Sequence, residues 1–129
     1  MTDLDGFAEK HPLNSRLVKR EGQLVEEVYR VGGRYGAQIA AIVQHLEAGI
    51  PHATEAMANA LRALIAFYRS GEDADREAYD IAWVQDKASP VDTINGFVEV
   101  YLDARSIKGA WEALVFYVNA EKTDRKSVV

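Results

Sequence analysis

The chain has 129 residues with 48% hydrophobic and 27% charged side chains, a composition typical of one soluble globular domain. A net charge of −5 argues against nucleic acid as a partner, because phosphate binding needs clustered lysine and arginine, and the absence of cysteine excludes disulfides and thiolate chemistry. With no apolar run of about 18 residues and an acidic start, the sequence predicts neither a membrane segment nor a signal peptide, so the expected location is the cytoplasm.

The first third of the chain predicts an arm and a β-hairpin. Residues 1–13 are acidic and show no periodicity, which indicates an arm that leads into the domain. Residues 14–33 contain two runs rich in β-branched residues on either side of Glu21-Gly22, and this pattern predicts a hairpin. The alternative is a helix that begins at Leu24, because the second run contains two glutamates.

Two helices are predicted within residues 35–70. The first spans residues 35–48, where apolar residues recur at helical spacing, and Gly49 and Pro51 supply its stop. The second extends from Pro51 to the Ser70-Gly71 pair. Its apolar stripe consists of Ala53, Met57, Ala60, Leu61, Leu64, Ile65 and Tyr68. Because the connection between the two helices is short, we expect them to pack antiparallel as a helical hairpin.

Residues 79–119 are predicted to supply further strands. Before them, a charged segment from residue 72 predicts a short helix or turn with Asp73 or Asp75 near its start. The apolar run of residues 81–84 then predicts a strand that enters the core, and Ser89-Pro90 marks a bend after it.

Alternation predicts a further strand in residues 97–103. Val98, Val100 and Leu102 form one unbroken apolar face, which we expect to be buried. Glu99 lies on the opposite face together with two aromatic residues.

Residues 111–118 fit both the apolar stripe of a helix and a strand, because periodicity alone does not distinguish the two in a short apolar run. Residues 104–109 predict a loop between antiparallel neighbours, and residues 121–129 predict a frayed tail. The predicted fold is one α+β domain over residues 1–129, in which the helical hairpin packs on a mostly antiparallel β-sheet or partial barrel.

Five blocks of the sequence, taken in order, resemble a known family. They are NSRLVK from Asn14, EEVYRVGG from Glu26, YDIAWVQD from Tyr79, VDTINGFVEVYLD from Val91 and KGAWEALVFYVN from Lys108. This combination resembles the middle of a dipeptidyl peptidase III. The resemblance covers nearly the whole chain, and it implies kinship with zinc metallopeptidases that remove dipeptides from the amino end of short peptides.

The zinc motif of that family is missing from this sequence. The family binds zinc through an H-E-x-x-G-H helix and a second acidic helix, whereas the histidines here, His11, His45 and His52, belong to no such motif. Pro51 interrupts the helix between the second and third of them. We therefore expect no metal ligand and no catalytic residue, so that the chain alone is inactive and zinc enters only with a missing catalytic portion.

The resemblance assigns a role to Asp92. In the family, the acidic residue ahead of the G-F-[IV]-E run helps to hold the free amino group of the bound peptide, and a carboxylate is the natural partner of an ammonium group. Thr93 and Asn95 lie beside it in the sequence and are expected to supply further hydrogen bonds. Glu99 is the fourth candidate substrate-binding residue, because its carboxylate lies on the same strand face as two aromatic residues.

These observations leave two functions open. In the first, the chain is the peptide-binding portion of a dipeptidyl peptidase III-like enzyme and holds the free amino end of a short peptide against an exposed strand edge. In the alternative, it is a structural or self-assembly module whose unpaired strand edges are covered in a homodimer. A third hypothesis, a small enzyme that uses Glu99 and Asp103, has no motif to support it.

Overall fold

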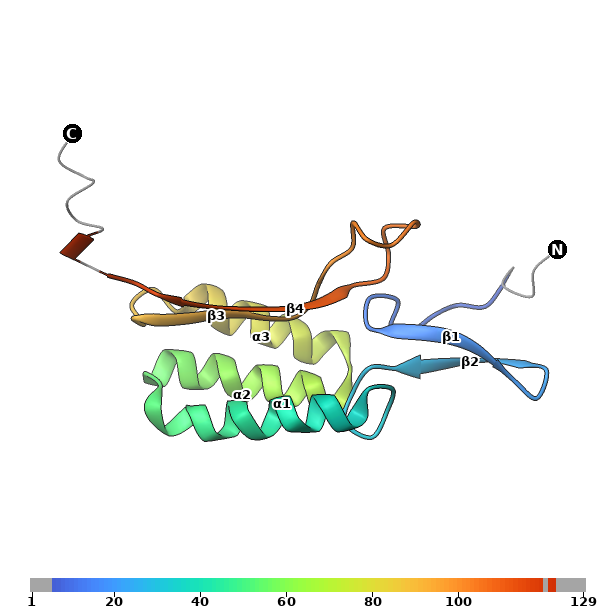
Figure 1. Cartoon of the computed structure of the whole chain (residues 1–129), viewed down its shortest axis with the longest axis horizontal. Helices are drawn as coiled ribbons and strands as arrows, with labels where there is room; N and C mark the ends of the chain where they lie inside the picture. Colours follow the sequence, from blue (N-terminus) through green and yellow to red (C-terminus); the bar gives the residue numbers. More distant parts are fainter. Residues whose placement is uncertain (1–5, 120, 123–129) are drawn as a thin grey trace.

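The protein is a mixture of helices and short antiparallel sheets, as expected for the α+β class (Figure 1). The computed structural model describes residues 6–119 and 121–122. Its elements are β1 (Ser15–Arg20), β2 (Gln23–Val28), α1 (Gly36–Gly49), the 3-10 turn η1 (Ile50–His52), α2 (Glu55–Ser70), α3 (Asp73–Gln85), β3 (Val91–Glu99) and β4 (Ala110–Tyr117). The strands form two separate two-stranded sheets, β1-β2 and β3-β4, and no closed barrel is present in the described part of the chain.

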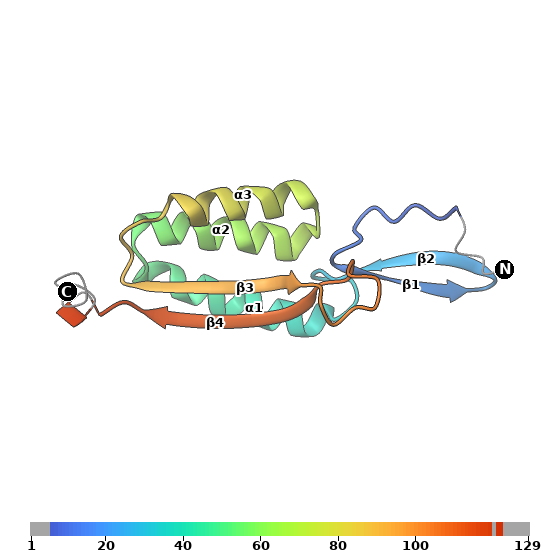
Figure 2. The same cartoon turned by 90° about the horizontal axis from the view of Figure 1, so that it is seen from above.

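The predicted first hairpin is confirmed. β1 and β2 pair antiparallel, with Arg20 opposite Gln23 at the turn. Glu21 and Gly22 both have positive φ angles, 50° and 82°, which a two-residue turn needs to match the twist of its strands. The hairpin projects from one end of the molecule (Figures 1 and 2). Of the predicted arm, residues 1–5 lie outside the described residues, as do residues 123–129 of the predicted tail.

The helical hairpin is also confirmed. α1 ends at Gly49, and α2 begins after Thr54, whose side-chain oxygen accepts a hydrogen bond from the backbone N–H of Met57 at 3.2 Å. Six of the seven predicted stripe residues belong to the core, together with Ile39 and Val43 of α1. The predicted start at Pro51 is wrong, because residues 50–52 form the 3-10 turn η1 and Ala53 precedes α2. None of the described helices has the length and apolar character that a membrane span requires.

The predicted strand at residues 81–84 is wrong, because these residues belong to the helix α3. Asp73 and Asp75 lie in the first turn of α3, where carboxylates favour the helix, as the sequence indicated. Tyr79 and Trp83 lie one turn apart and face the core, whereas Ile81 and Val84 are exposed. The helical spacing places Trp83 on the same face as Tyr79 and leaves Ile81 and Val84 on the exposed face.

The predicted buried face of Val98, Val100 and Leu102 is also wrong. A bulge between Phe97 and Glu99 breaks the alternation, and β3 ends there. Phe97 is the residue that enters the core, whereas Leu102 lies in the following loop with 74% of its surface exposed.

Ala110–Tyr117 forms the strand β4, which pairs antiparallel with β3. The sequence pattern of this region fitted both a helix and a strand. The loop before it is held by Asp103, whose carboxylate accepts hydrogen bonds from the backbone N–H groups of Ile107 and Lys108 at 2.9 and 3.2 Å. These bonds hold the pKa of Asp103 below its usual range.

One buried side chain joins the β3-β4 hairpin to the helices. The hydroxyl of Tyr68, on α2, donates a hydrogen bond to Oδ1 of Asn95 on β3 and accepts one from Nε1 of Trp111 on β4 at 2.9 Å. Tyr68 is fully buried. A single hydroxyl therefore fixes both strands over α2.

Removing this hydroxyl should destabilise the domain. Tyr68→Phe keeps the ring but leaves two polar partners without it, at a cost of about 1–3 kcal/mol in the free energy of unfolding. Urea unfolding followed by circular dichroism measures the loss. The matched control is Tyr101→Phe, because Tyr101 is exposed. Equal stabilities of the two variants would contradict this role of Tyr68.

Candidate functional site

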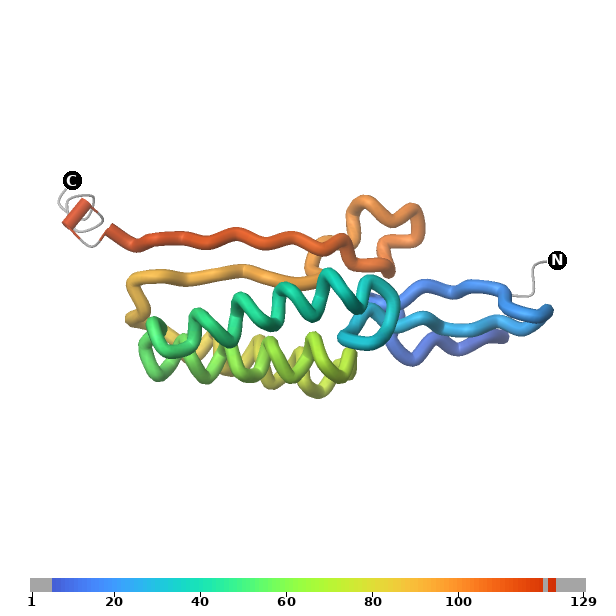
Figure 3. Tube along the Cα trace, turned by 60° about the horizontal axis from the view of Figure 1, so that its bottom comes forward, coloured from blue at the N-terminus to red at the C-terminus, as the bar shows by residue number. Residues whose placement is uncertain are grey.

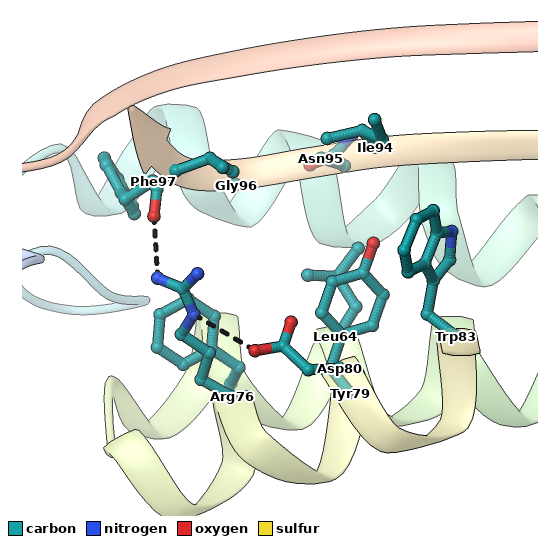
Figure 4. A pocket seen from close by; sticks show the side chains of 11 residues that line it. Leu64, Arg76, Tyr79, Asp80, Trp83, Ile94, Asn95, Gly96 and Phe97 are labelled. Atoms are coloured by element: carbon teal, nitrogen blue, oxygen red, sulfur yellow. Dashed lines mark hydrogen bonds and ion pairs between the residues drawn. The ribbon is translucent and has the colours of Figure 1, made fainter. Parts of the chain in front are cut away.

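One edge of the β3-β4 hairpin is closed by side chains of α3 (Figure 4). A guanidinium nitrogen of Arg76 donates to the carbonyl oxygen of Phe97 at 2.9 Å, and the hydroxyl of Tyr79 donates to the carbonyl oxygen of Thr93 at 3.4 Å. Further along, Nε1 of Trp83 donates to Oδ1 of Asp92 at 2.7 Å. Three side chains on one face of α3 thus bind Phe97, Thr93 and Asp92 along β3.

The contacts of α3 also show which backbone groups of β4 point away from β3. In an antiparallel ladder, pairs that exchange backbone hydrogen bonds alternate with pairs whose backbone groups point away from each other. The carbonyls of Thr93 and Phe97 bind α3. These two residues are therefore in pairs whose backbone groups point away from each other. Their partners in the register are Val115 and Trp111. The backbone N–H and C=O groups of these two residues therefore point to the outer side of β4.

That outer side is an open strand edge. Figures 2 and 3 show β4 on the outside of the hairpin, with β3 between it and α3, and within the described residues no further strand pairs with it. Val115 has 74% of its surface exposed. The other large apolar residues exposed on or directly after this strand are Trp111, Leu114, Phe116, Tyr117 and Val118.

A cavity of about 360 Å³ lies beside the first half of β3. We call it the Asp92 cavity. Its polar lining includes His45, His52, Asp92, Thr93 and Asn95, and Met57, Leu61 and Val115 are among its apolar lining residues. Its volume is within the range of small-ligand sites, roughly 300–1,000 Å³.

Three of the four predicted substrate-binding residues therefore lie together. Asp92, Thr93 and Asn95 all line the Asp92 cavity. Oδ1 of Asp92 accepts hydrogen bonds from Nε1 of Trp83 and from the backbone N–H of Thr93, both at 2.7 Å. The Thr93 hydroxyl donates to the carbonyl oxygen of Leu114 at 2.9 Å. The bonds from Trp83 and from the Thr93 backbone fix the position of the Asp92 carboxylate at the cavity wall.

Glu99 is separated from the other three. It lies at the far end of β3, seven positions after Asp92, which is about 23 Å in an extended strand. Its side chain is exposed. One short amino-terminal group cannot touch both carboxylates, so a peptide role for Glu99 stays a separate prediction.

The described residues do not fit the zinc that the family resemblance implies. His45 and His52 line the same cavity, but no three His, Asp or Glu side chains of the described chain are close enough together to hold a metal ion. Zinc sites in proteins need three or four such ligands.

Sequence reasoning missed the residues that close the edge of β3. Arg76, Tyr79 and Trp83 follow the helical spacing i, i+3 and i+7, and this spacing was the available signal. They also enclose a smaller cavity of about 190 Å³ between α2, α3 and β3, which Asn95 borders from the other side (Figure 4).

Known proteins resemble this chain over most of its length. The sequence matches the profile of peptidase family M49 over residues 8–128. Dipeptidyl peptidase 3 of Dictyostelium discoideum is 30% identical over 102 residues, which are 78% of this chain and 14% of that protein. The structure of DPP III from Caldithrix abyssi superposes with a TM-score of 0.77 and 18% identity, over 91% of this chain and 22% of that one. The chain thus spans less than a quarter of either relative.

Alkaline pH should weaken the contact between α3 and β3. Burial, assisted by the nearby Asp80 and Asp92 carboxylates, raises the pKa of Tyr79 to about 12, from 10.0 for a free tyrosine. Between these values the unfolded chain loses the proton first, so the stability present below pH 10 decreases as the pH rises toward 12.

The urea midpoint, measured from pH 9 to pH 11, tests this dependence. Tyr79→Phe should be less stable at pH 9, because its hydrogen bond to Thr93 is lost, and should then decrease less steeply than the wild type. Burial also raises the pKa of Tyr68, so some dependence remains. Parallel curves for the two proteins would be inconsistent with this assignment.

Proposed function

The chain belongs to peptidase family M49, and on this basis we propose that it is the peptide-holding portion of a dipeptidyl peptidase III-like enzyme, without catalytic activity of its own. It spans 14% of its relative from Dictyostelium discoideum, so the activity of a whole enzyme is not carried over to it. A cytoplasmic location is part of the proposal, supported by the absence of cysteine.

The observation that carries this proposal is the open edge of β4. An extended peptide can add to such an edge as another strand, and its backbone then binds the outward N–H and C=O groups without regard to side chains. Val115 and Trp111 present these groups, whereas α3 occupies the corresponding carbonyls on β3. Peptide binding is therefore directed to β4.

The Asp92 cavity gives the peptide a direction. Asp92 is opposite Phe116 in the register, so it lies toward the end of β4, and Val115 borders the same cavity. An ammonium group placed there meets a carboxylate that Trp83 and Thr93 already hold in position. Asp92 lies on β3, two strand spacings or about 10 Å from the open edge, so the first two or three residues of the peptide cross the end of β4. The residues after them extend along β4 toward Trp111, antiparallel to the strand. Thr93 and Asn95 line the wall that the first residue contacts.

Self-association is the second candidate function, and the same strand favours it. The exposed apolar residues on and after β4 form a surface that a second copy can cover by pairing its own β4 edge. A homodimer of this kind and a bound peptide use the same outward backbone groups. One molecule therefore cannot bind a peptide and pair with a second copy at the same time.

The substitution Asp92→Asn separates these functions. It removes the charge but keeps the hydrogen-bond acceptor for Trp83, so the fold should be retained. We expect it to weaken the binding of tetrapeptides with a free amino end by about 10-fold or more, the loss of a charge-assisted hydrogen bond. N-acetylated peptides of the same sequence should bind both proteins equally. Calorimetric titration gives these affinities.

The matched control is Glu99→Gln, which removes the same charge from the exposed far end of β3. It should leave both peptide forms unaffected. Light scattering on a sizing column in the same solutions reports the oligomeric state. A dimer that binds neither peptide form and does not respond to Asp92→Asn would refute the peptide-holding function and support self-association.

A further inference from the structure

A charged cavity lies between β1 and the loop that precedes β4. Its volume is about 230 Å³, and we call it the basic cleft. It is lined by Glu9, Ser15, Arg16, Leu17, Tyr29, Arg105 and Lys108. Three of these side chains are cationic and one is a carboxylate, whereas the whole chain has a net charge of −5. The cleft therefore concentrates positive charge on an otherwise acidic protein, and it fits an anionic group.

Two of the three cations are not neutralised by another side chain. Nζ of Lys108 forms an ion pair with the carboxylate of Glu9. Arg16 and Arg105, in contrast, are exposed and form no ion pair within the described residues. Asp103 lies near Arg105, but its carboxylate is already bound by backbone N–H groups of the same loop. Each guanidinium therefore keeps a planar set of donors that matches the two oxygens of a carboxylate.

The outer edge of β1 presents backbone groups at the same place. The carbonyl oxygen of Val28 accepts a hydrogen bond from the backbone N–H of Arg34 at 3.0 Å, so it points away from β1. Val28 is opposite Ser15 in the register, and Leu17 lies two positions further along β1. Because the two kinds of pair alternate along an antiparallel ladder, the N–H and C=O groups of Leu17 point to the outer side of β1.

The loop before β4 covers the beginning of this edge and leaves the edge open at the cleft. The N–H of Gly109 donates to the carbonyl oxygen of Leu13 at 2.8 Å, just before β1. Ser15 is fully buried, whereas Leu17 is half-buried and lines the cleft. Apart from β2, no strand of the described chain pairs with β1. An extended segment can therefore add to β1 from Leu17 outward.

We propose that the basic cleft binds the free carboxyl end of an extended peptide segment that pairs antiparallel with β1. The strand leads away from the helices to the turn of the hairpin (Figure 2), so an antiparallel segment runs back and ends at the cleft. Its terminal carboxylate meets Arg16 and Arg105, and its last backbone groups meet those of Leu17. A parallel segment places an ammonium group beside the same two cations, so the charge selects the antiparallel direction.

This site is separate from the one at Asp92. Asp92 lies on β3, and the Asp92 cavity shares no lining residue with the basic cleft. One site recognises an ammonium group and the other a carboxylate. The inference therefore goes beyond the proposed function, and either of the two can fail without the other.

A peptide set with both ends varied tests the site. The probe is a pentapeptide of alternating valine and threonine, which favours an extended conformation. It is prepared with its amino end free or acetylated and its carboxyl end free or amidated. Amidation should weaken binding about tenfold, through the loss of charge-assisted hydrogen bonds, and to the same degree with either form of the amino end. Calorimetric titration gives the four affinities.

Two variants locate the effect. Arg16→Gln and Arg105→Gln each remove one guanidinium and should leave the fold intact, because both side chains are exposed and form no ion pair within the described residues. Each should reduce the difference between acid and amide, and the double variant should abolish it. The matched control is Arg62→Gln, which removes the same charge from an exposed position on α2 and should preserve the tenfold difference.

The results that overturn the site are specific. Equal affinities of acid and amide, a difference that survives the double variant, or a failure of all four peptides to bind would refute it. A preference for the free amino end without one for the free carboxyl end would also refute it and leave the peptide-holding function standing.

Amide hydrogen exchange checks the pairing with β1. The acetylated acid should slow exchange at Leu17 and change little at Val18, whose N–H already binds β2. Protection confined to β4 would overturn the pairing.

Discussion

The structure depends on the way in which α3 is attached to β3. The two elements are joined by the polar tips of Arg76, Tyr79 and Trp83, which bind two carbonyls of the strand and the carboxylate of Asp92. Each bond contributes on the order of 0.5–1.5 kcal/mol, and together they satisfy an edge that otherwise attracts another strand. As a result the hairpin has one closed edge and one open edge, and that asymmetry is the basis of the proposed peptide-holding function.

The strand β4 runs between two cavities. One is the Asp92 cavity, which Val115 borders, and the other is an apolar cleft that Tyr35, Phe97 and Trp111 line. Tyr68 holds both strands from below, through Asn95 and Trp111, so the distance between the two ends is fixed by the core. An exposed apolar strand is a liability for aggregation unless something covers it. Each of the two proposed functions covers this strand, one with a peptide and the other with a second copy.

The elements that the sequence predicted well depend on local rules. The turn at Glu21-Gly22 and the stop at Gly49 are decided by neighbouring residues, and the family resemblance was carried by short blocks. Residues 81–84 were misread because their apolar run hides the helical spacing of Tyr79 and Trp83. The site was predicted in part. Asp92, Thr93 and Asn95 lie together because they are neighbours on one strand, whereas the contacts from α3 depend on tertiary structure that no local pattern contains.

The most direct test of the open edge is amide hydrogen exchange measured by NMR, residue by residue along β3 and β4, with and without a peptide that has a free amino end. The account predicts that the peptide slows exchange at Trp111, Ala113 and Val115, whose N–H groups point outward, and changes little at the intervening Glu112 and Leu114, whose N–H groups already bind β3. Protection that appears along β3 instead, or at all positions of β4 alike, would contradict the claim that α3 leaves one edge for the peptide.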